Sequence, residues 1–452
     1  MSSVDPAEAR YSLEAKESIW SADWHFRLLA LALGVLVGVI GTAFRLGAKR
    51  GFSLYARLLA PEDHGLWYRW LFAVLSDVVI VSVAVFATRR FAPEAAGSGV
   101  QEIEGTLAGI RPPLRWARVL PVKFFAGLLA MSAGLVLGRE GPTIHIGGCL
   151  GAALASWKPM VSARNNNVLI GAGSAAGLAV AFNAPIGGIL FALEEIRREF
   201  PLNPVSAQGV ALTTVTAIVV SHFIAGPARI LPIQTHDYPT LVELEMTLPF
   251  AMIMGAYGLF LNGALLRSLD LFRGIVSRVG WLLPTALTGA VVSLLVWLFP
   301  DATGGGEELV LRLLRRPRTF ELFTVLLVAR MAVFNVSYAI GAPGGLFFPL
   351  VAFGAISGLW FADFVRLLLP GFGFGAEKFA VAGMAALLGA TIRAPLTGLA
   401  LVIDMTGSYQ LLLMALFASI VADLTAGALG GRPIYQQLLD DAVGSNGSKS
   451  HA

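Results

Sequence analysis

The sequence predicts an all-α integral membrane protein built from two repeated halves. Of its 452 residues, 56% are apolar and 14% are charged, whereas soluble domains carry about 25% charged residues. These charges are too few to coat a soluble protein of this size. Several apolar stretches approach the roughly 20 residues that a membrane-spanning helix needs. They lie at 28–46, 70–87, 119–137, 210–224, 282–299 and 411–429.

The two halves are visible as an internal repeat. An offset of 207 residues pairs Lys123 with Arg330, Gly138 with Gly345, Pro142 with Pro349, Gly147 with Gly354 and Gly151 with Gly358. An offset of 210 pairs Ala172 with Ala382, Gly173 with Gly383, Ala184 with Ala394, Pro185 with Pro395, Gly188 with Gly398 and Glu194 with Asp404. Each half thus carries a Gly-x-x-x-Pro turn and, at a similar distance, an Ala-Pro turn. Such repeats are typical of transporters, although the offsets leave the relative orientation of the halves open.

The domain plan follows from where the apolar stretches begin and end. We expect a polar segment at 1–23, a transmembrane domain at 24–440 with halves at about 24–226 and 240–440, and a disordered tail at 441–452 without a soluble regulatory domain. The single cysteine, Cys149, excludes an internal disulfide framework and is too little for a zinc site. The formal charge of +4 indicates juxtamembrane Lys and Arg, not nucleic-acid binding.

Several predicted helices begin at Gly- or Pro-rich turns inside the apolar region. These starts lie near Ser98, Gly141, Ala184, Phe347 and Pro395. Irregular backbone at membrane depth is tolerated only where protein or a watery cavity satisfies its polar groups. We therefore expect these turns to line a site or to lie inside the helix bundle.

The turn from Gly138 to Pro142 is the strongest candidate site. It ends one apolar helix and begins another, so the N–H groups of Arg139, Glu140 and Gly141 should lie at a helix N-terminus, which favours anions. The carboxylate of Glu140 could occupy that anion site, and its protonation would release it. The simpler interpretation is that Glu140 only complements the helix dipole. Within a membrane, however, an ionisable side chain is functional by default.

Two further turns could contribute donors to an anion. Ser98 and Gln101 form a capping-box pattern, which uses the serine oxygen as acceptor and leaves its hydroxyl proton free. In the second half the counterpart of Glu140 is Phe347, so Leu346 and Phe347 can offer backbone N–H groups without a competing carboxylate. The preceding Gly344–Gly345 pair permits close backbone approach. By itself, Phe347 would more often pack in the core.

Glu194 and Glu195 close the helix that begins at Pro185. Carboxylates near a helix C-terminus are disfavoured by the dipole and by desolvation, which favours their protonated form and suits a proton carrier. The alternative is an interfacial acid pair balanced by Arg197 and Arg198, and the spacing does not decide between the two.

Other polar residues carry weaker signals. Glu104 and Lys123 lie close to or within spans, where they could pair with each other or set a field that attracts anions. Tyr435 follows the last span and by itself reads as an interfacial aromatic anchor. His145 and Cys149 lack metal-ligand company, so we expect them only to pack and we expect no metal and no cofactor.

Together these segments resemble the CLC family of chloride channels and chloride/proton antiporters, and the bacterial antiporters most closely. The resemblance covers residues from about 24 to 435. Its motifs are GSGV at 97–100, GREGP at 138–142, FNAPIGGILFALEE at 182–195 and GAPGGLFFP at 341–349. One departure is Val100–Gln101, where the family's first motif usually ends Ile-Pro.

The resemblance implies roles for the candidate residues. Glu140 corresponds to the gating glutamate, and Glu195 to an internal proton-transfer glutamate that the family's channels commonly lack. The central anion would be bound by the hydroxyls of Ser98 and Tyr435 and by the backbone N–H groups of Leu346 and Phe347. Serine at position 98 points to chloride. The implied fold is a homodimer with one pore per subunit, two inverted halves of tilted and partly re-entrant helices, and cytoplasmic termini.

We therefore expect a secondary active antiporter that exchanges chloride for protons across a bacterial inner membrane. A passive chloride channel of the same fold is the nearest alternative, and Glu195 argues against it. A membrane-embedded enzyme is a second alternative, but the sequence shows no Ser-His or Cys-His pair and no metal-ligand cluster. A sensor that binds an anion without moving it is a third.

Overall fold

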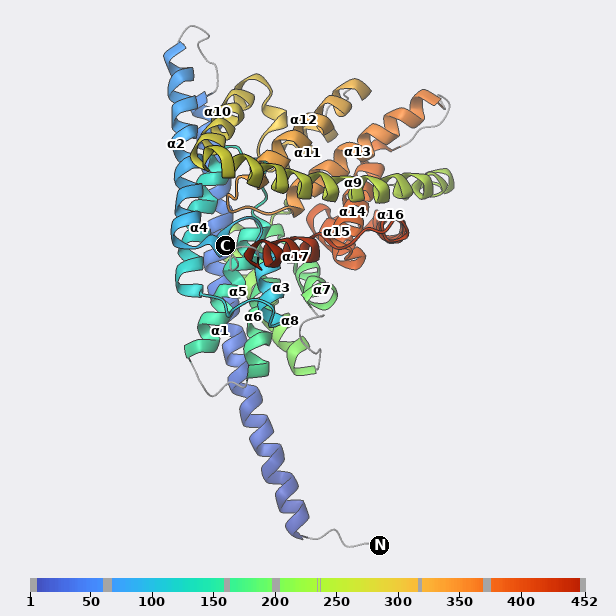
Figure 1. Ribbon diagram of the computed structural model, residues 1–452. Coiled ribbons are helices and arrows are strands. Elements are labelled where there is room, and N and C mark those ends of the chain that lie inside the picture. Colours follow the sequence, from blue (N-terminus) through green and yellow to red (C-terminus); the bar gives the residue numbers. More distant parts are fainter. Residues whose placement is uncertain are drawn as a thin grey trace.

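The computed structural model describes residues 6–59, 67–157, 163–196, 204–233, 235, 237–315, 319–368 and 375–447, and every named element in these ranges is helical (Figure 1). The first half comprises α1 (Pro6–Leu59), α2 (Trp67–Phe91), η1 (Pro93–Ala95), α3 (Val100–Leu107), α4 (Trp116–Ser132), α5 (Glu140–Trp157), α6 (Ala163–Phe182), α7 (Pro185–Glu194) and α8 (Pro204–Ala225). The second half comprises α9 (Leu241–Val279), α10 (Leu282–Leu298), η3 (Pro300–Ala302), α11 (Glu307–Arg315), α12 (Phe320–Ala339), α13 (Phe347–Leu368), α14 (Ala376–Ile392), α15 (Pro395–Thr406), η4 (Tyr409–Leu411), α16 (Leu412–Ala428) and α17 (Ile434–Gly447).

Seven helices in the described part of the chain are long and apolar enough to cross a membrane. They lie at Trp24–Arg57, Trp70–Phe91, Pro204–Ala225, Leu241–Val279, Phe320–Ala339, Phe347–Leu368 and Tyr409–Ala428. The helices are tilted differently, and α9 runs across Figure 1 whereas α1 runs along it. The predicted stretch at 119–137 is wrong at its end, because α4 stops at Ser132 and Gly134 takes a φ of +77°.

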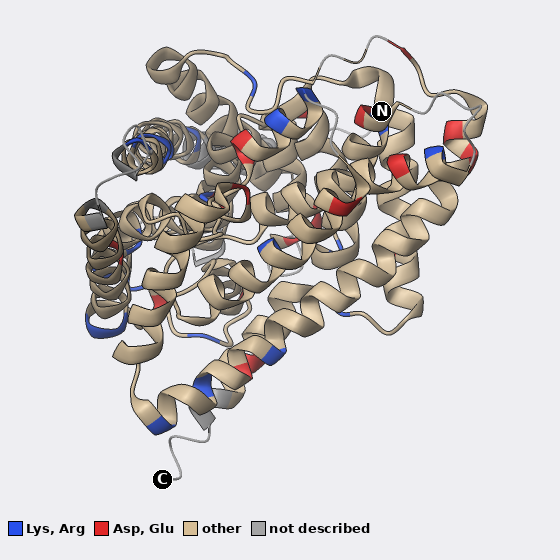
Figure 2. Ribbon diagram, turned by 90° about the horizontal axis from the view of Figure 1, so that it is seen from above, with Lys and Arg blue, Asp and Glu red and all other residues tan. Residues whose placement is uncertain are grey.

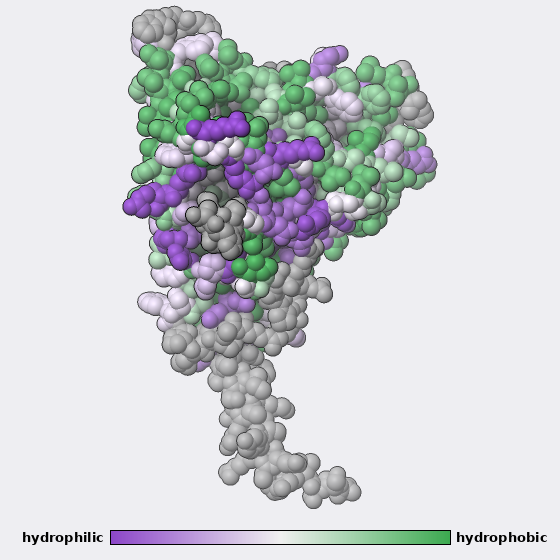
Figure 3. All heavy atoms as spheres, viewed as in Figure 1, coloured by the Kyte–Doolittle hydropathy of each residue, from purple (hydrophilic) through white to green (hydrophobic). Residues whose placement is uncertain are grey.

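The outer surface is that of a protein in lipid. Large apolar side chains such as Phe72, Phe125, Phe223 and Leu413 are exposed by more than half of their area. Figure 2 shows charged residues scattered among long uncharged stretches of helix, and Figure 3 shows apolar residues over most of the upper elements. Hydrophilic residues gather across the middle of the same face, where α17 lies.

The predicted repeat is present in the packing of the helices. Gly147 of α5 faces Gly173 of α6 so closely that a Cβ on either residue would overlap the carbonyl oxygen of the other. Gly354 of α13 and Gly383 of α14 make the same mutual contact. These four residues are the pairs that the offsets of 207 and 210 relate, so the repeat in the sequence corresponds to a repeated pair of closely packed helices.

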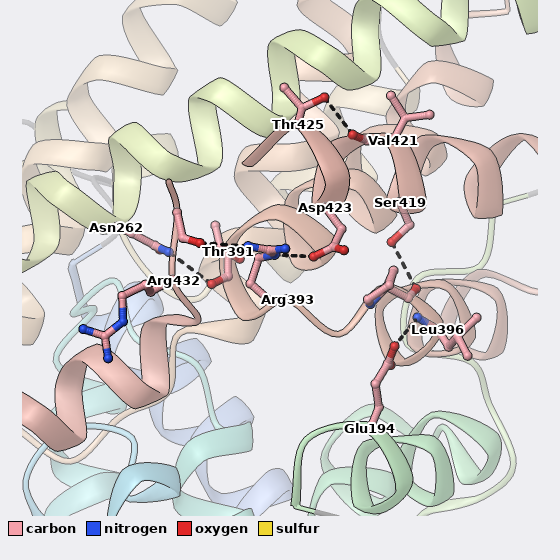
Figure 4. A network of polar contacts seen from close by, with 12 residues as sticks. Glu194, Asn262, Thr391, Arg393, Leu396, Ser419, Val421, Asp423, Thr425 and Arg432 are labelled. Carbon is pink, nitrogen blue, oxygen red and sulfur yellow. Dashed lines mark hydrogen bonds and ion pairs between the residues drawn. The ribbon is translucent and has the colours of Figure 1, made fainter. Parts of the chain in front are cut away.

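The two Ala-Pro helices, α7 and α15, which the offset of 210 relates, run in opposite directions, as inverted halves would require. The carboxylate of Asp404 at the end of α15 accepts N–H bonds from Ile186 (2.9 Å) and Gly187 (3.2 Å) at the start of α7. Reciprocally, Glu194 at the end of α7 accepts from the N–H groups of Leu396 (3.1 Å) and Thr397 (2.7 Å), and Figure 4 shows its contact with Leu396. Each helix therefore ends where the other begins, so the two related helices run antiparallel.

The C-terminal segment differs from the expected disordered tail. α17 continues to Gly447, so residues 441–447 are helical. Asp441 explains part of this extension, because its carboxylate binds the guanidinium of Arg273 on α9 at 3.0 and 2.6 Å and ties α17 to the body of the protein. Residues 448–452 lie outside the described part of the chain.

Candidate ion-transport site

Three loops that precede helix N-termini meet in the interior. Gly138 pairs with Gly345 as an antiparallel bridge, with Gly138 N donating to Gly345 O at 2.9 Å and Gly345 N to Gly138 O at 2.6 Å. Gly97 pairs with the loop at Pro343 through bonds of 3.2 and 2.9 Å. The loops before α3, α5 and α13 are thus fastened to one another. Their helix starts concentrate unpaired N–H groups and positive dipole ends, which makes this place suited to anions.

Glycine is required where these loops touch. A Cβ on Gly345 would overlap the carboxylate of Glu140 and lie 2.6 Å from Gly141 N. A Cβ on Gly141 would lie 2.7 Å from Ser98 Oγ and 2.8 Å from Gly345 Cα. Both distances are shorter than any ordinary carbon contact, so side chains at these positions would force the loops apart.

Glu140 begins α5 but directs its carboxylate to the other half of the protein. Its side chain is fully buried, and Oε1 accepts a hydrogen bond from the backbone N–H of Phe348 at 3.0 Å. The carboxylate stays close to its own helix start, as expected, because a Cβ on Gly138 would overlap both of its oxygens, and it also lies at the start of α13. Phe348 is a donor that the sequence interpretation missed. The repeat held the signal, since it aligned Glu140 with Phe347 one residue away.

Ser98 and Tyr435 bring two hydroxyl groups to the same place. Both residues are fully buried, the two hydroxyls lie next to each other, and neither hydroxyl makes a hydrogen bond to a third residue among those described. Buried polar groups are rarely left without a partner, so this pair fits a bound ligand that accepts hydrogen bonds. The interfacial anchor that Tyr435 suggests by itself is wrong, because the side chain is buried and its ring centre lies 6.0 Å from that of Phe347.

The predicted capping box at Ser98 is also wrong. The N-cap of α3 is Gly99, which has a φ of +85°, and no side chain caps it. The backbone N–H of Ser98 donates to the hydroxyl of Tyr338 at 3.2 Å, and that bond fixes the loop instead. The hydroxyl of Ser98 is therefore available to a ligand as both donor and acceptor.

Leu346 and Phe347 lie at the start of α13, as predicted. Both side chains are buried, and the ring of Phe347 packs against Phe182, Phe191 and Tyr435. The core-packing interpretation of Phe347 is thus correct for its ring. The packing of the ring does not involve the backbone N–H groups of Leu346 and Phe347. These can still bind an anion, because the first N–H groups of a helix have no partner within that helix.

Arg139 points away from the buried hydroxyls. Its guanidinium forms an ion pair with Glu307 at 3.0 Å, donates through Nε to Ala181 O at 3.2 Å, and lies 5.7 Å from the ring centre of Phe348. It lines a cavity of about 460 Å³ that also reaches Gly138 and Phe348. Arg139 can therefore serve a central anion only through its backbone N–H.

Lys123 supports the loop before α3. Its buried ammonium donates to Ala95 O at 3.0 Å and to Gly97 O at 2.7 Å, so it holds the backbone that carries Ser98. Arg330, its counterpart at an offset of 207, donates to Asp301 O, Thr303 O and Gly304 O at 2.9 to 3.0 Å.

Glu104 is buried on α3, near the hydroxyl of Tyr435. Its pairing with Lys123 stays a prediction.

The acid pair at the end of α7 divides into two different environments. Glu194 caps α15, where Thr397 also donates its hydroxyl at 2.8 Å, so its carboxylate has a structural role. Glu195 is the C-cap of α7 and is 3% exposed. Arg197 and Arg198, which the alternative interpretation paired with these acids, lie outside the described residues.

His145 is buried against Gly99, as expected for a packing residue. Among the described residues, no group of three or more His, Cys, Asp or Glu could hold a metal ion.

Comparisons with known proteins agree with this arrangement. The family model described as voltage gated chloride channel matches residues 78–427. The H(+)/Cl(-) exchange transporter ClcA of Vibrio cholerae is 37% identical over 413 residues, which cover 91% of this chain and 88% of the relative. ClcA of Klebsiella pneumoniae strain 342 is 37% identical over 416 residues, with the same two coverages. The crystal structure of a slow cyanobacterial Cl⁻/H⁺ antiporter has a TM-score of 0.86 and 32% identity, covering 93% of this chain and 98% of that one.

The fold and its buried helix starts thus define an integral membrane protein of the ion-transport class. The chain belongs to the CLC family of chloride channels and chloride/proton antiporters, and its relatives include bacterial exchange transporters.

Proposed function

We propose that this protein is a secondary active antiporter that exchanges chloride for protons. The observation that carries the proposal is the carboxylate of Glu140 on the first turn of α13, beside two buried hydroxyls that bond to no third residue among those described. A carboxylate bound where backbone N–H groups converge occupies an anion site. Protonation removes its charge and weakens its hold on the N–H of Phe348, so chloride can take its place. The exchange transporters among the relatives support the same reaction.

Chloride binds in this proposal without a metal or cofactor. Its ligands are the hydroxyls of Ser98 and Tyr435 and the backbone N–H groups of Leu346 and Phe347. The N–H groups of Arg139 and Gly141 face the second anion position, which the carboxylate of Glu140 occupies. Lys123 holds the Ser98 loop in place through two carbonyl oxygens, and the charge of Glu104 acts on the hydroxyl of Tyr435 from within the same region. Because Lys123 and the helix starts are positive and their positions are fixed, the site attracts an anion without reorganising.

Protons follow a second route that joins the first at Glu140. Glu195 is buried at the end of α7, and α7 lies in the part of the molecule nearer the N-terminus (Figure 1). Glu195 passes protons between that side and Glu140 through water. Glu140 belongs to both routes, so it cannot hold a proton and block chloride at the same time. This exclusion couples the two fluxes.

The proposal also assigns the two sides of the membrane. Lys49, Phe52 and Ala56, near the end of α1, line the cavity beside Arg139, so the cavity opens on the side opposite the N-terminus. In this proposal both termini lie in the cytoplasm of a bacterial cell, so the cavity opens on the outer side of the inner membrane. The functional unit in this proposal is a homodimer with one pore in each subunit.

Flux measurements in proteoliposomes test the exchange. A chloride gradient should drive protons uphill through the wild-type protein, and a passive channel would move chloride without moving protons. Glu195→Gln should abolish proton movement while chloride flux persists, and Glu140→Gln should make chloride flux independent of pH. Glu194→Gln is the matched control, because it removes a neighbouring charge that caps α15, and its coupling should stay intact. Undiminished proton coupling in Glu195→Gln would contradict the assignment.

A further inference from the structure

The cavity beside Arg139 contains a carboxylate that the proposed exchange does not use. Glu307, the first residue of α11, binds two cations across the cavity mouth: Lys49 Nζ at 3.2 Å and Arg139 at 3.0 Å. The side chains of Glu307 and Arg139 are 19% and 10% exposed, whereas Lys49 is 52% exposed. The ion pair to Arg139 is therefore largely shielded from water, which makes it stronger than an ordinary surface pair.

The position of Glu307 is related by the repeat to the loop at the central site. An offset of 207 takes Gly97, Ser98 and Gly99 to Gly304, Gly305 and Gly306, and Val100 to Glu307. The correspondence is structural, because Gly97 and Gly304 have φ of +58° and +68°, and Gly99 and Gly306 have φ of +85° and +107°. The same scaffold that brings Ser98 to the buried site brings the first turn of α11 to the cavity mouth. There a carboxylate replaces Val100.

Glu307 is connected to Glu140 by a chain of contacts through Arg139 and Phe348. Arg139, which Glu307 holds, lies over the ring of Phe348, and the backbone N–H of Phe348 binds the carboxylate of Glu140. Gly138 and Phe348 also line the cavity, so it reaches the site where Glu140 acts as the gate. Arg139 therefore lies between Glu307 and the segment that binds the carboxylate of Glu140.

Glu307 is charged at neutral pH. Burial raises its pKa, but the positive charges of Arg139 and Lys49 outweigh burial and hold the pKa of the Glu307 carboxyl below its usual range. Arg45 adds a third positive charge near Arg139. Two cations bind this carboxylate directly, so without Glu307 Lys49 and Arg139 would be left to attract an anion.

We infer that Glu307 is a tethered competitor for anions at the mouth of the gate. Its carboxylate occupies the position between Lys49 and Arg139 that an entering chloride would otherwise take, and it thereby lowers the affinity of the mouth for chloride. The inference rests on the proposed exchange function, which it extends from the gate to the entrance. A brace that only fixes Arg139 would affect the maximal rate and the stability, whereas a competitor affects the chloride concentration at which transport saturates.

The experiment compares Glu307→Gln with Glu308→Gln in proteoliposomes. Both variants lose one negative charge at adjacent positions of the cavity lining, but the side chain of Glu308 is exposed and only Glu307 binds Lys49 and Arg139. Glu307→Gln should lower the half-saturating chloride concentration by about threefold or more, with the coupling ratio unchanged. Glu308→Gln should leave the half-saturating concentration at the wild-type value. Glu307→Asp, which cannot span both cations, should shift it in the same direction by less.

Two results would overturn the inference. One is a half-saturating concentration that stays the same or rises in both Glu307→Gln and Glu307→Asp. The other is an equal decrease in Glu308→Gln, which would reveal a general effect of surface charge. Isothermal titration of the detergent-solubilised protein with potassium chloride separates this test from the exchange function. If the wild type moves no protons with chloride, the proposed function fails, while a lower chloride Kd in Glu307→Gln alone still supports the competitor.

Discussion

The loop before α3 and the loop before α11 occupy equivalent places in the two halves, and a buried cation supports each. Lys123 donates to the carbonyls of the first loop and Arg330 to those of the second. The backbones match, yet the first loop carries Ser98 where the second carries Gly305. The comparison shows that the scaffold is common to both halves. Their chemical difference lies in single side chains.

The starts of α5 and α13 repeat this lesson. They are bonded to each other through Gly138 and Gly345, but only one of them brings a carboxylate. Glu140 therefore reaches across and uses the N–H group that its counterpart helix leaves unpaired. The asymmetry gives the protein one gate, although it has two related helix starts.

The largest effect is expected where the two halves touch. Gly345→Ala places a Cβ within 2.6 Å of Gly141 N, and backbone cannot move out of its way without breaking the bridge to Gly138. We expect complete loss of exchange, together with aggregation in size-exclusion chromatography. Gly263→Ala on α9 is the control, because a Cβ there meets nothing within 4 Å. A monodisperse Gly345→Ala protein with wild-type flux would show that the contact between halves is not needed.

The next effect sharpens the comparison of the two loops. Ser98→Ala removes one hydrogen bond to a charged ligand, worth about 1.5–3 kcal/mol, so chloride affinity should fall about tenfold or more. Gly305→Ser, which adds a hydroxyl at the equivalent place, should change the affinity by less than about twofold. A Cβ at Gly305 has room, since its one neighbour is Leu137 O at 3.5 Å. Chloride titration by calorimetry measures both, and equal losses would mean that the loops are not chemically distinct.

The smallest effect concerns the reciprocal caps of α7 and α15. Glu194→Gln and Asp404→Asn each remove a charge from a helix N-terminus, and each should lower stability by about 1 kcal/mol, or about 1–3 °C in Tm. Both substitutions should lower stability, because each carboxylate accepts two backbone N–H bonds of the other helix, and Glu194→Gln should lower it more, because Glu194 also accepts from the hydroxyl of Thr397. Thermal unfolding followed by intrinsic fluorescence measures them. A large loss of stability from one substitution alone would show that the two caps are not equivalent.

The sequence was sufficient for the class of fold, the helix starts and the repeat. Gly and Pro mark helix starts for reasons of local conformation, so α5, α7, α13 and α15 begin within a residue of their predicted positions. Residues that the repeat pairs also meet in the structure, although the offset itself predicts no contact. Gly138 and Gly345, paired by the offset alone, are bonded to each other.

Side-chain directions could not be predicted in the same way. The carboxylate of Glu140 reaches α13, and Ser98 does not cap α3, because both depend on how distant loops are packed. Similarly, neighbouring Glu194 and Glu195 look alike in sequence, but only the position of α15 makes Glu194 a cap. The end of α17 was misjudged since its stability comes partly from Arg273, far away in the chain.

The bridge between Gly138 and Gly345 also has a consequence for biosynthesis. A ribosome adding roughly 5–20 residues per second needs about 10–40 s to make the chain between these two glycines. During that interval the first half lies in the membrane with the partner of Glu140 not yet made. Tyr435 arrives later still, with α17. The anion site is therefore assembled only when nearly all of the chain has been translated, so a prematurely ended product lacks the parts to leak anions across the membrane.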